Sequence, residues 1–232
     1  IRWAEQSPEN FKFNFKVPKK ISHQHAAVEL VADWLKLIRP LSQKIGFIHL
    51  QLPASFGPEQ LPYLATLLAA IRTEHSCALE VRHPAFFDKA QQQQSLHQLL
   101  RAHQTERLCF DSRALFSVEP NTAALRDAQQ KKPRLPVQVV ALTTQPVFRF
   151  IGVDDLAVNR AFYQPWLSKM QQWRAEGFTP YAFFHTPDNM LAPQLAKQFA
   201  ADFAELTGET HPILKPWPDS APLSKAPQLP LF

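Results

Sequence analysis

The chain has 232 residues, of which 45% are hydrophobic and 19% charged, a composition typical of a globular protein with one substantial core or two small ones. Its formal net charge of +5 is too small an excess to indicate nucleic-acid binding by itself. No apolar run approaches the roughly 20 residues that a membrane helix requires, and residues 1–10 do not resemble a signal peptide. Cys77 and Cys109 lie among apolar neighbours, so we expect buried free thiols and a cytoplasmic protein.

The first half of the chain alternates between patterns of period two and patterns of helical spacing, which indicate strands and helices respectively. The predicted elements are a strand at 11–17, a helix at 25–39, a strand at 46–52, a helix at 59–72, a strand at 77–83 and a helix at 91–103.

The second half continues this alternation after a less regular stretch at 112–145. That stretch holds a predicted helix at 122–131 and a strand or buried extended piece at 137–142. The elements around it are a strand at 107–111, a strand at 147–152, a helix at 160–176, a strand at 179–185 and a helix at 191–206, after which Gly208 ends the ordered structure.

Strand and helix thus alternate six times, which predicts an α/β fold with parallel strands and helical crossovers. Six βα units fit either an open doubly wound sheet or a TIM-type (β/α)₈ barrel that lacks two units. No G-x-G-x-x-G or P-loop pattern occurs, which argues against a nucleotide-binding Rossmann fold.

Polar side chains recur near the C-terminal end of each predicted strand. They are Lys16, His49, Gln51, Glu80, Arg82, Asp111, Arg149 and His185. The active sites of barrels lie at this end of the strands, and a polar group from every strand favours a barrel over an open sheet. His83 falls on the opposite face of its strand from Glu80, so we expect it to be structural.

The chemistry predicted for this ring is anion binding with acid–base catalysis. Lys16, Arg82 and Arg149 suit a phosphate or carboxylate, and Gln51 would join them as a ligand-binding residue. The candidate catalytic acids or bases are Glu80, Asp111 and His185. The same three residues are also a possible divalent metal site, although no metal-ligand spacing supports one and the cofactor stays open.

The same residues carry a resemblance to a known family. The motifs are Phe13-Asn14-Phe15-Lys16-Val17-Pro18, Gln51-Leu52-Pro53-Ala54-Ser55-Phe56, Glu80-Val81-Arg82-His83-Pro84, Asp111-Ser112-Arg113, Arg149-Phe150-Ile151-Gly152 and Phe184-His185-Thr186-Pro187-Asp188. Over nearly the whole chain they resemble the YecE-like family, whose members have a TIM-barrel-type fold and no established activity.

The resemblance implies a single barrel domain at 1–207 that lacks the first two βα units at its N-terminus. This sequence departs from the wider family at two places. Ile151 replaces a histidine in an Arg-x-His-Gly strand, and His185-Thr186 replaces paired asparagines. These differences put the transfer of any wider-family site in doubt.

Residues 208–232 contain six prolines and predict an extended tail. The tail ends in Gln228-Leu229-Pro230-Leu231-Phe232, which looks like the bacterial sliding-clamp-binding motif, with Gln228, Leu229, Leu231 and Phe232 as the partner-binding residues. The alternative is that these apolar residues fold back and cover the barrel.

Two functions therefore stay open. The first is an enzyme acting on a small anionic substrate, and the second is an interaction module recruited to the DNA sliding clamp. The basic cluster Lys131-Lys132-Pro133-Arg134 predicts a solvated loop, with a phosphate-backbone contact as the minor alternative.

Overall fold

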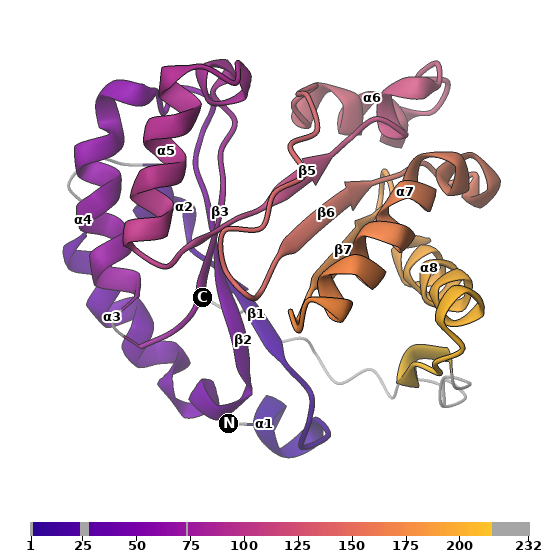
Figure 1. Ribbon diagram of the computed structural model, residues 1–232, viewed down its shortest axis with the longest axis horizontal. Helices are drawn as coiled ribbons and strands as arrows, with labels where there is room; N and C mark the ends of the chain where they lie inside the picture. Colours follow the sequence, from indigo (N-terminus) through magenta and orange to yellow (C-terminus); the bar gives the residue numbers. More distant parts are fainter. Residues whose placement is uncertain (1, 24–27, 73, 215–232) are drawn as a thin grey trace.

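A computed structural model describes residues 2–23, 28–72 and 74–214 of the chain. Its strands form two parallel sheets (Figure 1), one in the order β1-β2-β3-β4 and one in the order β5-β6-β7. The strands are β1 (Phe13–Lys16), β2 (Ile45–Gln51), β3 (Cys77–Glu80), β4 (Glu106–Arg107), β5 (Cys109–Asp111), β6 (Val147–Ile151) and β7 (Tyr181–His185).

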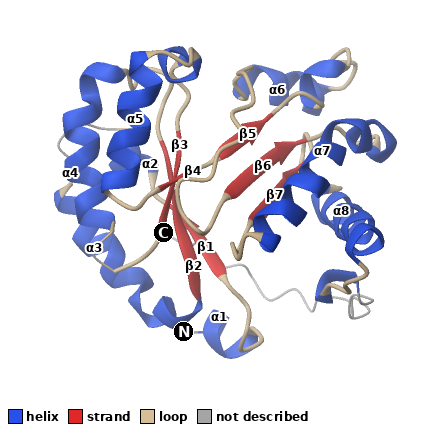
Figure 2. Ribbon diagram, in the orientation of Figure 1, coloured by secondary structure: helices blue, strands red, loops and turns tan. Residues whose placement is uncertain are grey.

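The longer helices cover the outer faces of the two sheets, and shorter ones lie around them (Figure 2). They are α1 (Arg2–Gln6), α2 (Lys19–Ser22), α3 (Glu29–Ile38), α4 (Leu61–Ile71), α5 (Gln91–Ala102), α6 (Ala123–Lys131), α7 (Leu156–Ala175) and α8 (Ala192–Thr207). Helices α3, α4 and α5 flank the first sheet, and α7 and α8 flank the second. None of the helices among the described residues has both the length and the apolar character needed to span a bilayer.

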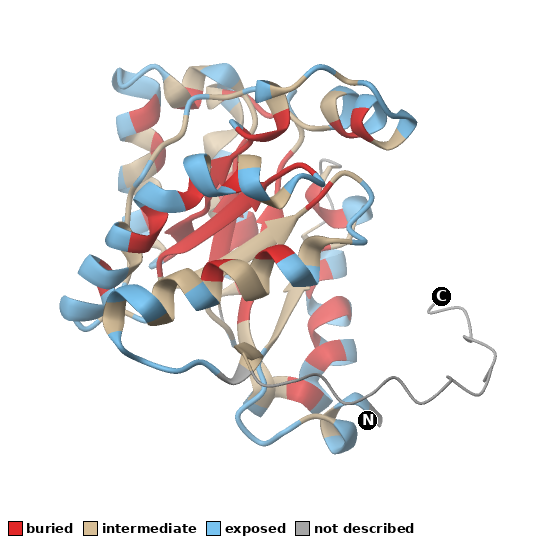
Figure 3. Ribbon diagram, turned by 90° about the vertical axis from the view of Figure 1, so that its right-hand side faces the viewer, coloured by how far each residue is buried: buried red, intermediate tan, exposed pale blue. Residues whose placement is uncertain are grey.

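Apolar side chains form three layers, with the buried strands at the centre of the molecule (Figure 3). One layer lies between α3–α5 and the first sheet, and another between the second sheet and α7–α8, where Phe148 stacks on Trp166 at a centroid distance of 4.4 Å. The third layer joins the inner faces of the two sheets and includes Phe47, Ala78 and Phe183. The inner faces therefore pack against each other rather than facing water.

The two sheets are joined by one nearly continuous extended run, residues 106–111. Its first part pairs with β3 and its second part with β6, and the change of partner occurs at Leu108. The Leu108 amide still donates to the Leu79 carbonyl at 2.8 Å. One predicted strand thus contributes to both sheets.

The α/β architecture with parallel strands is as predicted, but no closed barrel forms among the described residues. Some boundaries also differ. β3 ends at Glu80 instead of continuing to 83. Of the two alternatives for residues 137–142, the strand is wrong, and the segment is instead an irregular piece that packs partly buried against the core. α7 begins at Leu156, four residues before the predicted start, because the Asp155 side chain accepts the amides of Ala157 and Val158 as an N-cap. α8 ends at Thr207, one residue after the predicted end, with Gly208 in the left-handed region at φ 73°. The expectation that ordered structure ends at Gly208 is wrong, because Pro212–Leu214 form a short 3-10 helix.

Candidate functional site

The carboxylate of Glu80, at the end of β3, is the centre of a charged cluster and is only 1% exposed. Arg82 donates to its Oε1 from Nε at 3.0 Å and from Nη2 at 2.9 Å. Arg149 donates to its Oε2 from Nη1 at 2.8 Å, and His49 Nε2 lies 3.2 Å from the same oxygen. Three side chains, from β2, from the segment after β3 and from β6 of the other sheet, therefore share one buried carboxylate.

Strand register explains why these residues meet. His49 is opposite Ala78 and Gln51 opposite Glu80 in the pairing of β2 with β3. Successive side chains point to opposite faces of a strand, so His49 and Gln51 follow the inward-facing Phe47, and Glu80 follows the inward-facing Ala78. The polar cluster therefore lies above an apolar inner layer, toward the C-terminal ends of the strands.

Two further contacts extend the cluster toward the surface. The Gln51 Oε1 atom accepts hydrogen bonds from Lys16 Nζ at 2.8 Å and from Arg82 Nη2 at 3.0 Å. His185 Nε2 accepts from Arg149 Nε at 3.0 Å, and its Nδ1 lies 2.9 Å from Asn189 Oδ1. Because an amide oxygen only accepts, these partners assign the proton of neutral His185 to Nδ1.

Burial and the neighbouring charges change the pKa values of the groups within the cluster. Burial would raise the pKa of Glu80, but His49, Arg149 and Arg82 together hold that pKa well below its usual range. Burial, reinforced by Arg149, lowers the pKa of His185 to about 4. Burial also lowers the pKa of His49, against the opposing effect of Glu80. At neutral pH the cluster thus contains an ionised Glu80 and a neutral His185.

Lys132, directly after α6, is a cation that the sequence prediction left out of the candidate site. It is half-buried, and burial followed by the charges of Arg149 and Arg82 lowers its pKa to about 8. A solvated loop was predicted for 131–134. Lys131 is exposed but is the last residue of α6 and pairs with Asp127 at 2.6 Å, and Lys132 is half-buried, so the prediction is wrong for both lysines. Nothing in the local pattern distinguishes these adjacent lysines, because only the tertiary fold buries one of them.

Asp111 does not join the cluster. The inward-facing residue of β5 is Phe110, which lies opposite Arg149 in the strand pairing and contacts its guanidinium at 5.7 Å from ring centroid to Cζ. Asp111 therefore points outward, where it accepts from Trp166 Nε1 at 2.8 Å and pairs with Arg113 at 2.8 Å. The sequence interpretation assigned this strand the wrong inward face.

Because Asp111 lies apart from Glu80 and His185, these three residues do not form the divalent metal site that the sequence analysis considered. Within residues 2–23, 28–72 and 74–214, no group of three or more His, Cys, Asp and Glu side chains is arranged to hold a metal ion. His83 Nδ1 accepts from the Ala85 amide at 3.2 Å and caps a short 3-10 helix, in keeping with the structural role expected for it.

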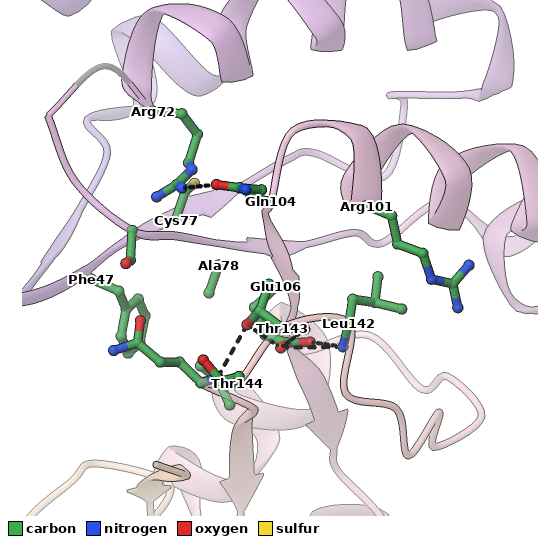
Figure 4. A pocket seen from close by; sticks show the side chains of 13 residues that line it. Phe47, Arg72, Cys77, Ala78, Arg101, Gln104, Glu106, Leu142, Thr143 and Thr144 are labelled. Carbon is green, nitrogen blue, oxygen red and sulfur yellow. Dashed lines mark hydrogen bonds between the residues drawn. The ribbon is translucent and has the colours of Figure 1, made fainter. Parts of the chain in front are cut away.

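A hollow of about 360 Å³ lies at the opposite, N-terminal end of the strands (Figure 4). Two of its charged lining groups are already engaged. Glu106 accepts from the amides of Leu142 and Thr143, and Arg72 donates to the carbonyls of His75 and His103. In open parallel α/β sheets ligands bind at the carboxyl ends of the strands, which is the end where the Glu80 cluster lies. The Glu80 cluster is therefore the better candidate site.

The buried carboxylate predicts a large effect of Glu80→Gln. Without the negative charge, Arg82 and Arg149 stay close together and uncompensated, which should lower the free energy of unfolding by about 3–5 kcal/mol. Chemical denaturation measures this change. Glu209→Gln is the matched control, because Glu209 forms an exposed pair with Arg174 and its loss should cost at most about 1 kcal/mol. Equal costs for the two variants would contradict this role of Glu80.

The lowered pKa values of two histidines predict that the free energy of unfolding falls in mild acid. Burial, together with Arg107, lowers the pKa of His97 to about 4, as burial and Arg149 do for His185. The unfolded chain binds protons at these positions from about pH 6.5 downward and the folded protein does not, so the free energy of unfolding should fall between about pH 7.5 and 5.5. Chemical denaturation at both pH values tests this, and His97→Gln/His185→Gln should reduce the dependence. An unchanged dependence in the double variant would contradict the assignment.

Comparison with known proteins places the chain in a family. A family model described as "Protein of unknown function DUF72" matches residues 1–221. The UPF0759 protein YecE of Escherichia coli K12 is 42% identical over 212 residues, which cover 90% of this chain and 78% of that protein. YecE of E. coli O157:H7 matches with the same identity and coverage.

Solved structures agree with the fold. Two crystal structures of a DUF72 family protein from Enterococcus faecalis V583 match with TM-scores of 0.67 and 0.64 at 16% identity. The matches cover 90% of this chain and 83% and 79% of those chains. At this identity the likeness concerns the fold alone. The chain belongs to the DUF72 family, which confirms the resemblance to YecE-like proteins.

Proposed function

We propose that the Glu80 cluster binds a small anionic ligand that carries a phosphate or carboxylate group. The observation that supports this most directly is the excess of cations, since Arg82 and Arg149 both pair with Glu80 and Lys16 donates to Gln51, which Arg82 also contacts. Among the described residues, Arg82 Nη1 and Arg149 Nη2 have no hydrogen-bond partner. Guanidinium groups with free N–H donors match the oxygens of phosphates and carboxylates.

The arrangement also supports acid–base chemistry on such a ligand. Glu80 is held ionised by Arg82 and Arg149, so it suits the role of a fixed counter-ion that orients both guanidinium groups. His185 is neutral and less buried, and its Nε2 carries a lone pair that now accepts from Arg149. In this proposal a bound anion replaces His185 as the partner of Arg149, and the imidazole becomes the proton acceptor.

For the fold, we propose six consecutive βα units of a TIM-type barrel, open between β1 and β7. Residues 106–111 support this arrangement, because they connect the two sheets as a single barrel strand would. The inward-facing apolar layer beneath a polar layer at the strand ends is also typical of such barrels.

Thermal shift with phosphorylated and carboxylated metabolites tests the anion site. A ligand that binds the folded protein alone, at about 100 times its Kd, adds about 2.7 kcal/mol to the free energy of unfolding and should raise the Tm by several degrees. Arg82→Ala and Arg149→Ala should abolish that increase. Arg126→Ala is the control, since Arg126 is exposed and donates to the Pro120 carbonyl away from the cluster. If both cluster variants retain every shift, no anion site exists there.

A second candidate function is recruitment to the bacterial DNA sliding clamp. It rests on the terminal pentapeptide at 228–232, in which Gln228, Leu229, Leu231 and Phe232 would bind the partner, and these residues lie outside the described part of the structure. In this proposal the tail acts as a tether and the folded domain as its cargo.

Pull-down with purified clamp tests the tail. We expect the full chain to retain the clamp and a chain ending at Ala226 to lose it, because the truncation removes all four proposed anchors. Leu231→Ala/Phe232→Ala in the full chain should have the same effect without shortening the tail. Equal retention of the clamp by the full chain and the truncated chain would contradict the proposal.

A further inference from the structure

A groove of about 840 Å³, here called the β7 groove, lies between β7, the C-terminal end of α7 and α8 (Figure 1). It is more than twice as large as the hollow at the N-terminal end of the strands. Its floor is aromatic, because Phe184 of β7 packs on Phe199 of α8 at a centroid distance of 4.9 Å, and Phe178 and Phe203 lie beside them. The groove therefore suits apolar side chains.

The charged groups that line the β7 groove are engaged with each other or with the chain. Arg174 pairs with Glu209 at 2.6 Å, and its Cζ lies 5.6 Å from the ring centroid of Phe203. His211 Nδ1 accepts from the Ile213 amide at 3.2 Å. These are the charged or titratable side chains at the ends of the groove, and none is placed to pair with a ligand charge. The groove therefore favours an uncharged occupant.

The β7 groove follows the open edge of its strand. Among the described residues β7 pairs with β6 alone, and its five residues are half-buried, whereas all five residues of β6 are buried. Tyr181 faces inward and Ala182 outward, yet both line the groove. The Tyr181 amide donates to the Pro146 carbonyl at 2.8 Å on the side of β6, so Ala182 and Phe184 direct their amides and carbonyls to the open side. Extended peptides bind along such edges.

The chain itself supplies an occupant that fits this groove. Four of the residues at 209–213 line it, and the described part of the chain ends at Leu214, beside it. Residues 215–227 lead from there to the segment 228–232, and an extended chain of that length reaches about 40 Å, more than twice the roughly 17 Å that β7 spans. The segment 228–232 has no charged side chain and three large apolar ones.

We propose that the segment 228–232 docks in the β7 groove of its own chain, with Leu229, Leu231 and Phe232 on the aromatic floor and the backbone along the open edge of β7. Pro230 has no amide hydrogen, which an edge position tolerates. A short tether gives the segment a local concentration of about 1 mM. Even an intrinsic Kd of about 100 µM then keeps the groove about 90% occupied.

This inference goes beyond the anion site and does not depend on it. The side chains that dock in the β7 groove are also the proposed clamp anchors, so docking and clamp binding exclude each other. The groove proposal concerns the chain alone and can be tested without the clamp.

Competition with a labelled peptide tests the docking. The probe is a fluorescein-labelled peptide of residues 226–232, and its binding is followed by fluorescence anisotropy with the full chain and with the full-length variant Leu229→Ala/Leu231→Ala/Phe232→Ala. This triple variant should bind the peptide, because its own segment has lost the anchors. The unaltered chain should bind it about tenfold more weakly, the factor expected for about 1 mM of tethered competitor and a Kd of about 100 µM.

Two measurements locate the binding. Ala200→Glu in the triple variant should abolish peptide binding, because it places a carboxylate against the aromatic floor. Ala201→Glu is the matched control, since Ala201 is the next residue of α8 and is exposed outside the groove. Photo-crosslinking does not depend on the folding of a groove variant. A peptide with p-benzoylphenylalanine in place of Phe232 should react with groove residues such as Met170.

Tighter peptide binding by the triple variant, with cross-links in the β7 groove, supports the proposal. Equal behaviour of the two full-length proteins, whether both bind the peptide or neither does, would overturn it, as would cross-links outside the groove. A difference that appears only when the protein concentration is raised would place the segment in the groove of a second copy, and it would overturn docking within one chain.

Discussion

The ionised carboxylate of Glu80 is the constraint on which this end of the molecule depends. A buried charge is tolerated only when it is paired, and here the partners are Arg82 from the same segment, Arg149 from the other sheet and His49 from the neighbouring strand. Because Arg149 contacts both Glu80 and His185, the position of the imidazole also depends on this carboxylate. The contacts that compensate the charge of Glu80 therefore also determine how the side chains of the site are arranged.

Much of the fold is visible in the periodicity of the sequence. The alternation at 11–17 and the helical stripe at 59–72 are local signals, and they predict β1 and α4 to within a few residues. The change of sheet at Leu108 cannot be read in this way, because it depends on which strand each half of 106–111 pairs with. The helical spacing predicts a start at 160, whereas α7 begins at Leu156, because the Asp155 side chain caps the helix before its apolar stripe begins.

The site could be predicted as far as side-chain alternation determines it. Period two places Gln51, Glu80 and Arg149 correctly on the inner face, since each lies an even number of residues from an inward-facing apolar neighbour. The same rule fails for Asp111, because β5 is too short to show which of its residues face inward, and Phe110 takes that position. Lys132 lay beyond prediction, because its environment consists of residues far away in sequence.

The crossing at Leu108 divides the chain into two contiguous halves, with the first sheet drawn from residues 13–107 and the second from residues 109–185. Lys16, Glu80 and Arg82 belong to the first half, and Arg149 and His185 to the second. The cluster thus contains residues from both halves of the chain, and neither half has a complete set of its groups. A ligand held by cations from both halves would act as a noncovalent cross-link between them. Its binding would therefore depend on the assembly of the two halves as well as on recognition of the ligand.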